Sequence, residues 1–142
     1  MVEPEKSLIN IAQELGTALK VRGFVLALAE SCTGGMVAQA VTSIAGSSTW
    51  FDRGFVTYSN TAKIDMLGVS AQTLEKFGAV SEQTAAEMAL GCLKLSALKH
   101  DQTNLGGSIT GIAGPDGGTA DKPVGTVCFG IEIGRASCRE RV

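Results

Sequence analysis

A short apolar run in this sequence is followed at once by a polar, glycine-containing turn, and this arrangement limits the folds open to the chain. Residues 24–29 are Phe-Val-Leu-Ala-Leu-Ala, without the alternation of a strand that has one face in water. Such a run is typical of a strand buried on both faces, as in a parallel sheet. Residues 30–35, Glu-Ser-Cys-Thr-Gly-Gly, precede apolar residues at helical spacing, from Met36 to Ile44. The chain is therefore expected to pass from a buried strand through a turn into a helix.

The rest of the chain alternates between helical and strand periodicity. Further helices are expected at residues 4–20, after Ser59 or Asn60, after Ser70 and from Ser81. Further strands are expected at residues 50–58, 105–109 and 124–131, although Gly106 and Gly107 weaken the second of these. Alternating strands and helices in 142 residues predict one α/β domain with a mostly parallel or mixed sheet.

Composition excludes several classes of protein. Hydrophobic residues make up 44% and charged residues 18%, which excludes a disordered chain. A formal net charge of -2 argues against a nucleic-acid partner, and no apolar run is long enough to span a membrane. Four cysteines without a C-x-x-C pair, and one histidine, argue against a metal site. Scattered thiols and an amphipathic, acidic N-terminus without signal-peptide character predict a cytoplasmic protein.

Ser31 is the first candidate for chemistry, because it follows the predicted buried strand and precedes the predicted helix. Backbone N–H groups at a helix start favour negative charge, so a serine there can be a nucleophile beside an oxyanion hole. The alternative is an N-cap, a role in which serine is common. Cys32 is a rival nucleophile, although a cysteine beside a strand end is more often a small buried apolar residue.

A serine nucleophile needs a base, and the sequence offers one histidine, His100. Its position beside Lys99 at a predicted helix end is typical of a surface residue and does not favour a Ser-His-Asp triad. A lysine whose pKa is lowered by burial is the usual substitute. Lys63 is the best placed lysine, because it follows a polar cluster, residues 57–60, at the end of a predicted strand. The alternative for Lys63 is a solvated helix residue.

The third candidate is the segment 111–118, Gly-Ile-Ala-Gly-Pro-Asp-Gly-Gly, which follows a predicted strand. Successive amides in such a loop can form a nest for an anion, but a plain connecting loop fits the pattern equally well. The segment matches neither a P-loop nor a G-x-G-x-x-G fingerprint. Glu30 and Asp116 are a minor option as a carboxylate pair. The cluster Trp50, Asp52 and Arg53 is either a structural strand end or the rim of a binding site.

Six segments in a fixed order carry a resemblance to a known family. They are residues 29–35, 44–48 (Ile-Ala-Gly-Ser-Ser), 53–60 with Lys63, 78–81 (Gly-Ala-Val-Ser), 110–118 and 122–127 (Lys-Pro-Val-Gly-Thr-Val). Together they resemble the CinA C-terminal domain family, the stand-alone nicotinamide-nucleotide amidases, from the first helix to Phe129.

The resemblance implies a three-layer α/β/α domain that hydrolyses the carboxamide of nicotinamide mononucleotide to the acid, in pyridine nucleotide salvage, without cofactor or metal. It implies Ser31 as nucleophile, Lys63 as base and Tyr58 as a residue that orients the lysine or the substrate. The amides of Thr33 and Gly34 are expected to stabilise the oxyanion. The other residues expected to bind the nucleotide substrate are Gly35, Ser47, Ser48, Asn60, Thr110, Gly111, Gly114, Asp116 and Gly117.

The end of the chain does not resemble the family. Residues 1–132 are expected to form the amidase-type domain, and residues 133–142 are expected to be a non-native tail that resembles translated adapter sequence. The family pattern is expected to continue past Phe129, so one face of the last strand is expected to be exposed. A homo-oligomer is left open. The alternative function is a non-catalytic nucleotide-binding or regulatory module, while a phosphate-handling enzyme would need a metal or a lysine-rich loop.

Overall fold

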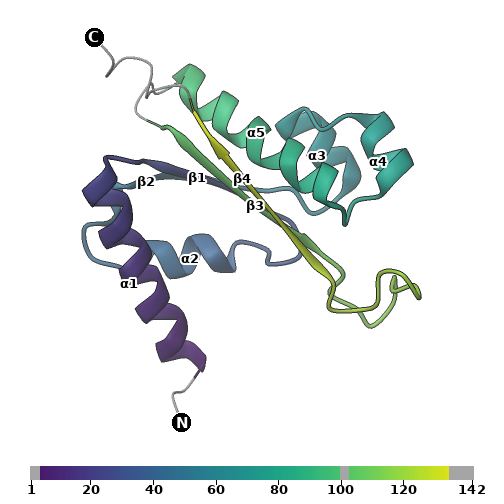
Figure 1. Ribbon diagram of the computed structural model, residues 1–142, viewed down its shortest axis with the longest axis horizontal. Coiled ribbons are helices and arrows are strands. Elements are labelled where there is room, and N and C mark those ends of the chain that lie inside the picture. The colour runs from purple at the N-terminus through teal and green to yellow at the C-terminus, as the bar shows by residue number, and fades with distance from the viewer. Residues whose placement is uncertain (1–3, 100–102, 135–142) are drawn as a thin grey trace.

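The computed structural model describes residues 4–99 and 103–134. Figure 1 shows the helices and strands along the chain. Their bounds, in chain order, are α1 (Pro4–Arg22), β1 (Leu26–Glu30), α2 (Met36–Thr42), η1 (Ser47–Thr49), β2 (Phe51–Val56), α3 (Asn60–Leu67), α4 (Ala71–Phe77), α5 (Glu82–Lys99), β3 (Leu105–Gly111) and β4 (Val127–Ile133). Every predicted element is present within a few residues of its predicted bounds. Ser59, Ser70 and Ser81 begin the last three helices, each accepting a hydrogen bond from a backbone N–H of its helix.

The four strands form one mixed sheet in the order β2-β1-β3-β4. β1 is parallel to both β2 and β3, whereas β4 returns antiparallel to β3. Helices α1 and α2 cover one face, and α3, α4 and α5 cover the other, as Figure 1 shows. The predicted three-layer α/β/α fold is confirmed. β1 lies between two parallel neighbours, β2 and β3. The segment that follows β1 therefore lies at the carboxyl edge of the sheet, where α/β proteins bind their ligands.

The central strand β1 is buried along its whole length, which explains its unbroken apolar sequence. Leu26 and Leu28 face a first core with Trp50 and residues of α1 and α2. Ala27 and Ala29 face a second core around Met88 of α5. The small side chains lie on the α5 side, so the helix can pack close to the sheet there.

Two glycines under α5 are required by this close approach. A Cβ on Gly106 would lie 2.4 Å from the carbonyl oxygen of Ala89, and one on Gly130 would lie 2.3 Å from that of Ala85. Both distances are far below van der Waals contact, so any larger residue would push the helix away. Gly106 was expected to weaken its strand, but in the structure it permits the packing of α5 on β3.

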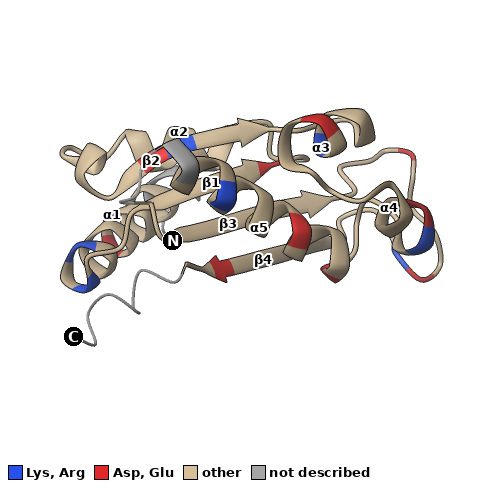
Figure 2. Cartoon of the chain, turned by 90° about the horizontal axis from the view of Figure 1, so that it is seen from above, with Lys and Arg blue, Asp and Glu red and all other residues tan. Residues whose placement is uncertain are grey.

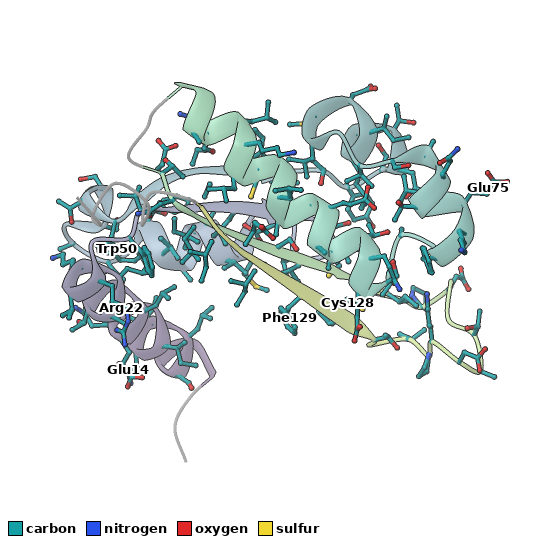
Figure 3. The ribbon with its side chains drawn as sticks, turned by 45° about the horizontal axis from the view of Figure 1, so that its top comes forward. Glu14, Arg22, Trp50, Glu75, Cys128 and Phe129 are labelled. Atoms are coloured by element: carbon teal, nitrogen blue, oxygen red, sulfur yellow. The ribbon has the colours of Figure 1, made fainter. Side chains whose placement is uncertain are left out.

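The other face of β4 is apolar and exposed. Val127, Phe129, Ile131 and Ile133 alternate along it with exposed fractions of 42%, 70%, 75% and 59%. Figure 3 shows Phe129 on the side of β4 turned away from α5. This exposed face agrees with the expectation from the sequence. β4 includes Ile133, so the expected boundary at residue 132 falls within a strand, and residues 135–142 of the expected tail lie outside the described residues.

We predict that replacing both Phe129 and Ile131 with threonine lowers self-association and leaves the free energy of unfolding within about 1 kcal/mol of its original value. Side chains that are already in water lose little hydrophobic stabilisation when they are shortened, and threonine keeps a high strand propensity. Light scattering and denaturant unfolding measure the two quantities. A large loss of stability would show that another part of the molecule covers this face.

Gly130→Ala is the matched control, since this residue lies on the same strand with its Cα turned toward α5. The added methyl group meets the Ala85 carbonyl, and overpacking of this kind costs about 1–3 kcal/mol. The control is therefore expected to destabilise the protein, although it changes the side-chain volume less than replacement of Phe129 and Ile131 does.

Candidate active site

The turn after β1 is fixed by Glu30, the last residue of the strand. Its side chain is only 1% exposed, and its carboxylate accepts hydrogen bonds from the N–H groups of Gly35 (3.2 Å), Val37 (3.0 Å) and Ala38 (3.0 Å). These are orphan donors at the start of α2, where the helix dipole favours a negative charge. Glu30 therefore caps the helix, and the N-cap interpretation of Ser31 is wrong. Because its carboxylate is used in this way, Glu30 also does not pair with Asp116.

The backbone hydrogen bonds between the parallel strands β1 and β3 continue for one more residue, at Ser31. Its N–H donates to the carbonyl of Ile109 at 3.0 Å, and the residue is buried. With its amide fixed by β3 and the following turn fixed by Glu30, its hydroxyl is held at the end of β1. Gly34 and Gly35 have φ of 59° and 105°, conformations that need glycine, so their role is to let the chain turn into α2.

Lys63 lies on α3, which begins directly after β2, and its side chain reaches back to Ser31. The side chain is 1% exposed, and its Nζ lies 3.0 Å from the Oγ of Ser31. Nζ also donates to the carbonyl oxygens of Thr57 at 2.9 Å and Tyr58 at 3.1 Å. The two predicted catalytic residues, distant in sequence, are therefore in direct contact.

Burial lowers the pKa of Lys63, and the neighbouring Cys32 offsets this in part. A neutral amine has two N–H groups and one lone pair. In the neutral form of the amine, two N–H groups bonded to the carbonyls of Thr57 and Tyr58 would leave the lone pair for the hydroxyl of Ser31. The geometry and the lowered pKa together make Lys63 suited to accept a proton from Ser31.

A pocket of about 310 Å³ opens beside this pair. Its lining residues are Ser31, Cys32, Tyr58, Lys63, Ala79, Val80, Thr110, Gly111, Ile112, Ala113, Gly114, Asp116 and Gly117. The volume suits a small organic ligand. The structure thus brings the predicted catalytic residues together with the glycine-rich loop, including Gly111, Gly114, Asp116 and Gly117.

Tyr58 and Thr110 line the pocket, but the contacts that they make differ from the expected ones. The side chain of Tyr58 is 72% exposed, and it is the backbone carbonyl of this residue that orients Lys63. The hydroxyl of Thr110 donates to the carbonyl of Ala79 at 2.8 Å, so this side chain fixes the segment 78–81 to the end of β3.

Six of the predicted substrate-binding residues are not among those that line the pocket: Thr33, Gly34, Gly35, Ser47, Ser48 and Asn60. Asn60 is the exposed first residue of α3. Ser47 and Ser48 lie in η1, which precedes β2, and β2 is parallel to β1. They are therefore at the opposite end of the sheet from Ser31, and the prediction that they hold the ribose and phosphate does not fit the geometry.

The expected oxyanion donors also change. The N–H of Gly34 donates to the carbonyl of Ser31 at 3.1 Å, and that of Gly35 donates to Glu30. Within the described chain, the N–H groups of Cys32 and Thr33 have no hydrogen-bond partner. Gly34 is therefore excluded as an oxyanion donor, and the free N–H groups of this turn are those of Cys32, which lines the pocket, and Thr33, which is not among the lining residues.

Sequence reasoning missed the helix-capping role of Glu30, the lysine-orienting carbonyl of Thr57 and the pocket wall at Ala79 and Val80. A glutamate within a mostly apolar buried strand was the available signal for the first. The other two act through backbone or apolar contacts, which leave no signature in residue type. His100, expected to be a surface residue, lies outside the described residues.

No group of three or more His, Cys, Asp or Glu side chains that could hold a metal ion is found in the described part of the chain. Among the same residues, no helix is both long and apolar enough to cross a membrane. Figure 2 shows the lysine and arginine positions of the described residues spread over several elements, with acidic positions among them.

Fold and site define an α/β protein with a buried serine–lysine pair at the carboxyl edge of its sheet. The model of one family, the CinA C-terminal domain, matches residues 8–142, and the chain belongs to this family. It is 59% identical over 127 residues to "Nicotinamide-nucleotide amidohydrolase PncC" of Enterobacter agglomerans, covering 89% of this chain and 74% of the relative. The protein of the same name from Escherichia coli K12 is 53% identical over 131 residues, covering 92% and 76%. The crystal structure of competence/damage inducible protein CihA from Agrobacterium tumefaciens has a TM-score of 0.82 at 47% identity, covering 94% of this chain and 76% of that chain.

We predict that Glu30→Gln lowers the free energy of unfolding by about 1–3 kcal/mol and also reduces activity. The amide keeps one acceptor oxygen, but it turns an NH₂ group toward backbone donors and removes the charge that favours the helix start. Denaturant unfolding measures the loss. Glu14→Gln, on the exposed face of α1, is the control and leaves stability unchanged; an equally small effect at Glu30 would contradict the capping role.

The lowered pKa of Lys63 predicts a pH-dependent contribution to stability. Between the pKa in the folded protein and the ordinary lysine pKa of about 10.4, the unfolded chain binds more protons than the folded one. Stability from this group therefore rises with pH across that window. Thermal unfolding of wild type and Lys63→Met at several pH values tests this, and the difference shifts in favour of wild type as the pH rises. Parallel curves would show that Lys63 titrates normally.

Proposed function

We propose that this chain is a nicotinamide-nucleotide amidohydrolase, which converts nicotinamide mononucleotide and water to nicotinate mononucleotide and ammonia. The observation that carries the proposal is the buried contact of 3.0 Å between the Lys63 amine and the Ser31 hydroxyl. The names of the relatives that are 59% and 53% identical support the substrate. The proposal also includes a role in pyridine nucleotide salvage in the cytoplasm, which is expected from the resemblance to the family and from the sequence.

In the first half of the reaction, neutral Lys63 takes the proton of Ser31 while the serine oxygen attacks the carboxamide carbon. The N–H groups of Cys32 and Thr33 are the donors that can meet the negative oxygen of the tetrahedral intermediate. The Lys63 ammonium then gives its proton to the amide nitrogen. The C–N bond breaks, ammonia leaves, and an ester joins the Ser31 oxygen to the pyridine carbonyl.

In the second half, a water molecule takes the place of ammonia. Lys63 accepts a proton from this water as its oxygen attacks the ester carbon, and then returns a proton to the oxygen of Ser31. The acid is released and the serine hydroxyl is restored. Both half-reactions use the same base, which is why the amine must be neutral at the start of each.

The remaining pocket suits the rest of the nucleotide. Gly111, Gly114 and Gly117 leave the backbone of the loop accessible, and amides in such a loop can bind a phosphate. The Asp116 carboxylate in the same lining suits ribose hydroxyls and disfavours an adjacent phosphate.

The test is ammonia release from nicotinamide mononucleotide by wild type and Ser31→Ala. Loss of the nucleophile lowers kcat by several orders of magnitude, because no acyl-enzyme can form, while the melting temperature stays close to that of wild type. Lys63→Arg is expected to be equally inactive, since a guanidinium cannot act as a base at these pH values.

Ser70→Ala is the matched control for loss of a serine hydroxyl. This residue caps α4 through the N–H of Gln72, so its loss costs about 1 kcal/mol of stability and leaves turnover intact. Near-normal turnover by Ser31→Ala would overturn the mechanism. Binding of the nucleotide by wild type without ammonia release would instead favour a non-catalytic nucleotide-binding module.

A further inference from the structure

The pocket has one wall that is fixed at many points. Residues 78–81 connect α4 to α5, and Ala79 and Val80 line the pocket. The carbonyl of Gly78 accepts hydrogen bonds from the hydroxyls of Ser81 (3.0 Å) and Thr84 (2.7 Å). The carbonyl of Ala79 accepts another from Thr110. This wall is therefore held firmly against β3 and the start of α5.

The opposite wall, residues 111–117, belongs to the long connection between β3 and β4. Its base is fixed by the N–H of Ile112 on the carbonyl of Thr126 (2.9 Å), and by the N–H of Gly125 on that of Ile112 (2.8 Å). Gly114 and Gly118 pack on Val124, where an added Cβ would lie 2.5 Å and 2.7 Å from its atoms. The loop is thus folded against residues 124–126, which precede β4, and these contacts do not join it to the other wall.

Lys122 makes that join. Its Nζ donates to the carbonyl of Phe77 at 2.8 Å, at the C-terminal end of α4, where unpaired carbonyls and the helix dipole favour a cation. A tight turn presents the lysine, because the N–H of Lys122 bonds to the hydroxyl of Thr119 and the N–H of Thr119 bonds to the carbonyl of Lys122. Among the described residues, no carboxylate lies within ion-pair distance of the Lys122 ammonium. The hydrogen bond to the Phe77 carbonyl is therefore the one polar contact of the Lys122 ammonium among the described residues.

We propose that Lys122 is a positioning residue. It ties the loop that contains residues 111–117 to the end of α4 and so sets the width of the pocket. This proposal rests on the proposed function. Lys122 acts through the loop and does not take part in the chemistry at Ser31. Its loss lets the loop move away from Ala79 and Val80, so the substrate is held less well while the Ser31–Lys63 pair stays intact.

The test compares Lys122→Met with Lys122→Arg in the full chain. Lys76→Met is the control, because this lysine lies on the last turn of α4, with Nζ 5.2 Å from the Phe77 ring centre, and does not bridge to the loop. Lys122→Met is expected to raise KM about 5- to 20-fold with kcat changed by less than about twofold, and to speed hydrogen exchange in residues 111–118. Lys122→Arg restores most of both properties, and Lys76→Met changes neither.

Two substrates separate this role from direct binding of the phosphate. Nicotinamide mononucleotide and nicotinamide riboside differ only in the phosphate, so a residue that positions the loop affects both to the same extent. A loss confined to the mononucleotide would overturn the proposal and make Lys122 a phosphate ligand. Unchanged KM and unchanged exchange would overturn it as well. If wild type releases ammonia from neither substrate, the proposed function fails, and the exchange rates alone still decide whether Lys122 holds the loop.

Discussion

The Lys63 amine is held out of water and in contact with the Ser31 hydroxyl, and this buried contact is the central physical constraint on the fold. Burying an amine is unfavourable, and burial is the main cause of the lowered pKa of Lys63. The protein compensates with two backbone carbonyls, those of Thr57 and Tyr58, which accept hydrogen bonds from the amine. Both carbonyls lie in the short connection between β2 and α3, so one segment supplies the lysine and also the groups that orient it.

The partner of this amine is held by a separate device on the neighbouring strand. β1 fixes the backbone of Ser31, and the buried carboxylate of Glu30 fixes the turn that follows by capping α2. Glu30 and Ser31 are adjacent in sequence but face opposite layers of the fold. One side chain stabilises the helix below the sheet, while the next meets the lysine above it. The alternation of side chains along a strand thus separates the helix-capping carboxylate from the hydroxyl that meets Lys63.

The sequence was sufficient for the order of the elements, the layered fold and the positions of Ser31 and Lys63. These depend on periodicity, on helix-capping serines and on segments that resemble a known family. It was not sufficient for contacts made by the backbone. The carbonyl of Tyr58, and the amides of Cys32 and Thr33, are defined by where the chain turns, and any residue type supplies the same groups. Ser47 and Ser48 were misplaced for a related reason, because their residue types suit a phosphate but the direction of β2 puts them at the far edge of the sheet.

The connection between β3 and β4 shows how strongly the site shapes the fold. These strands are antiparallel neighbours, and two residues are enough to join such a pair. The chain instead uses residues 112–126, a length that is uncommon for a hairpin and that costs conformational entropy. The extra residues do not extend the sheet; several of them line the pocket beside Ser31. The parallel strands place the Ser31–Lys63 pair at the carboxyl edge of the sheet, and the connection to the antiparallel strand β4 supplies a wall of the pocket beside it, so both parts of the mixed sheet contribute to the candidate site.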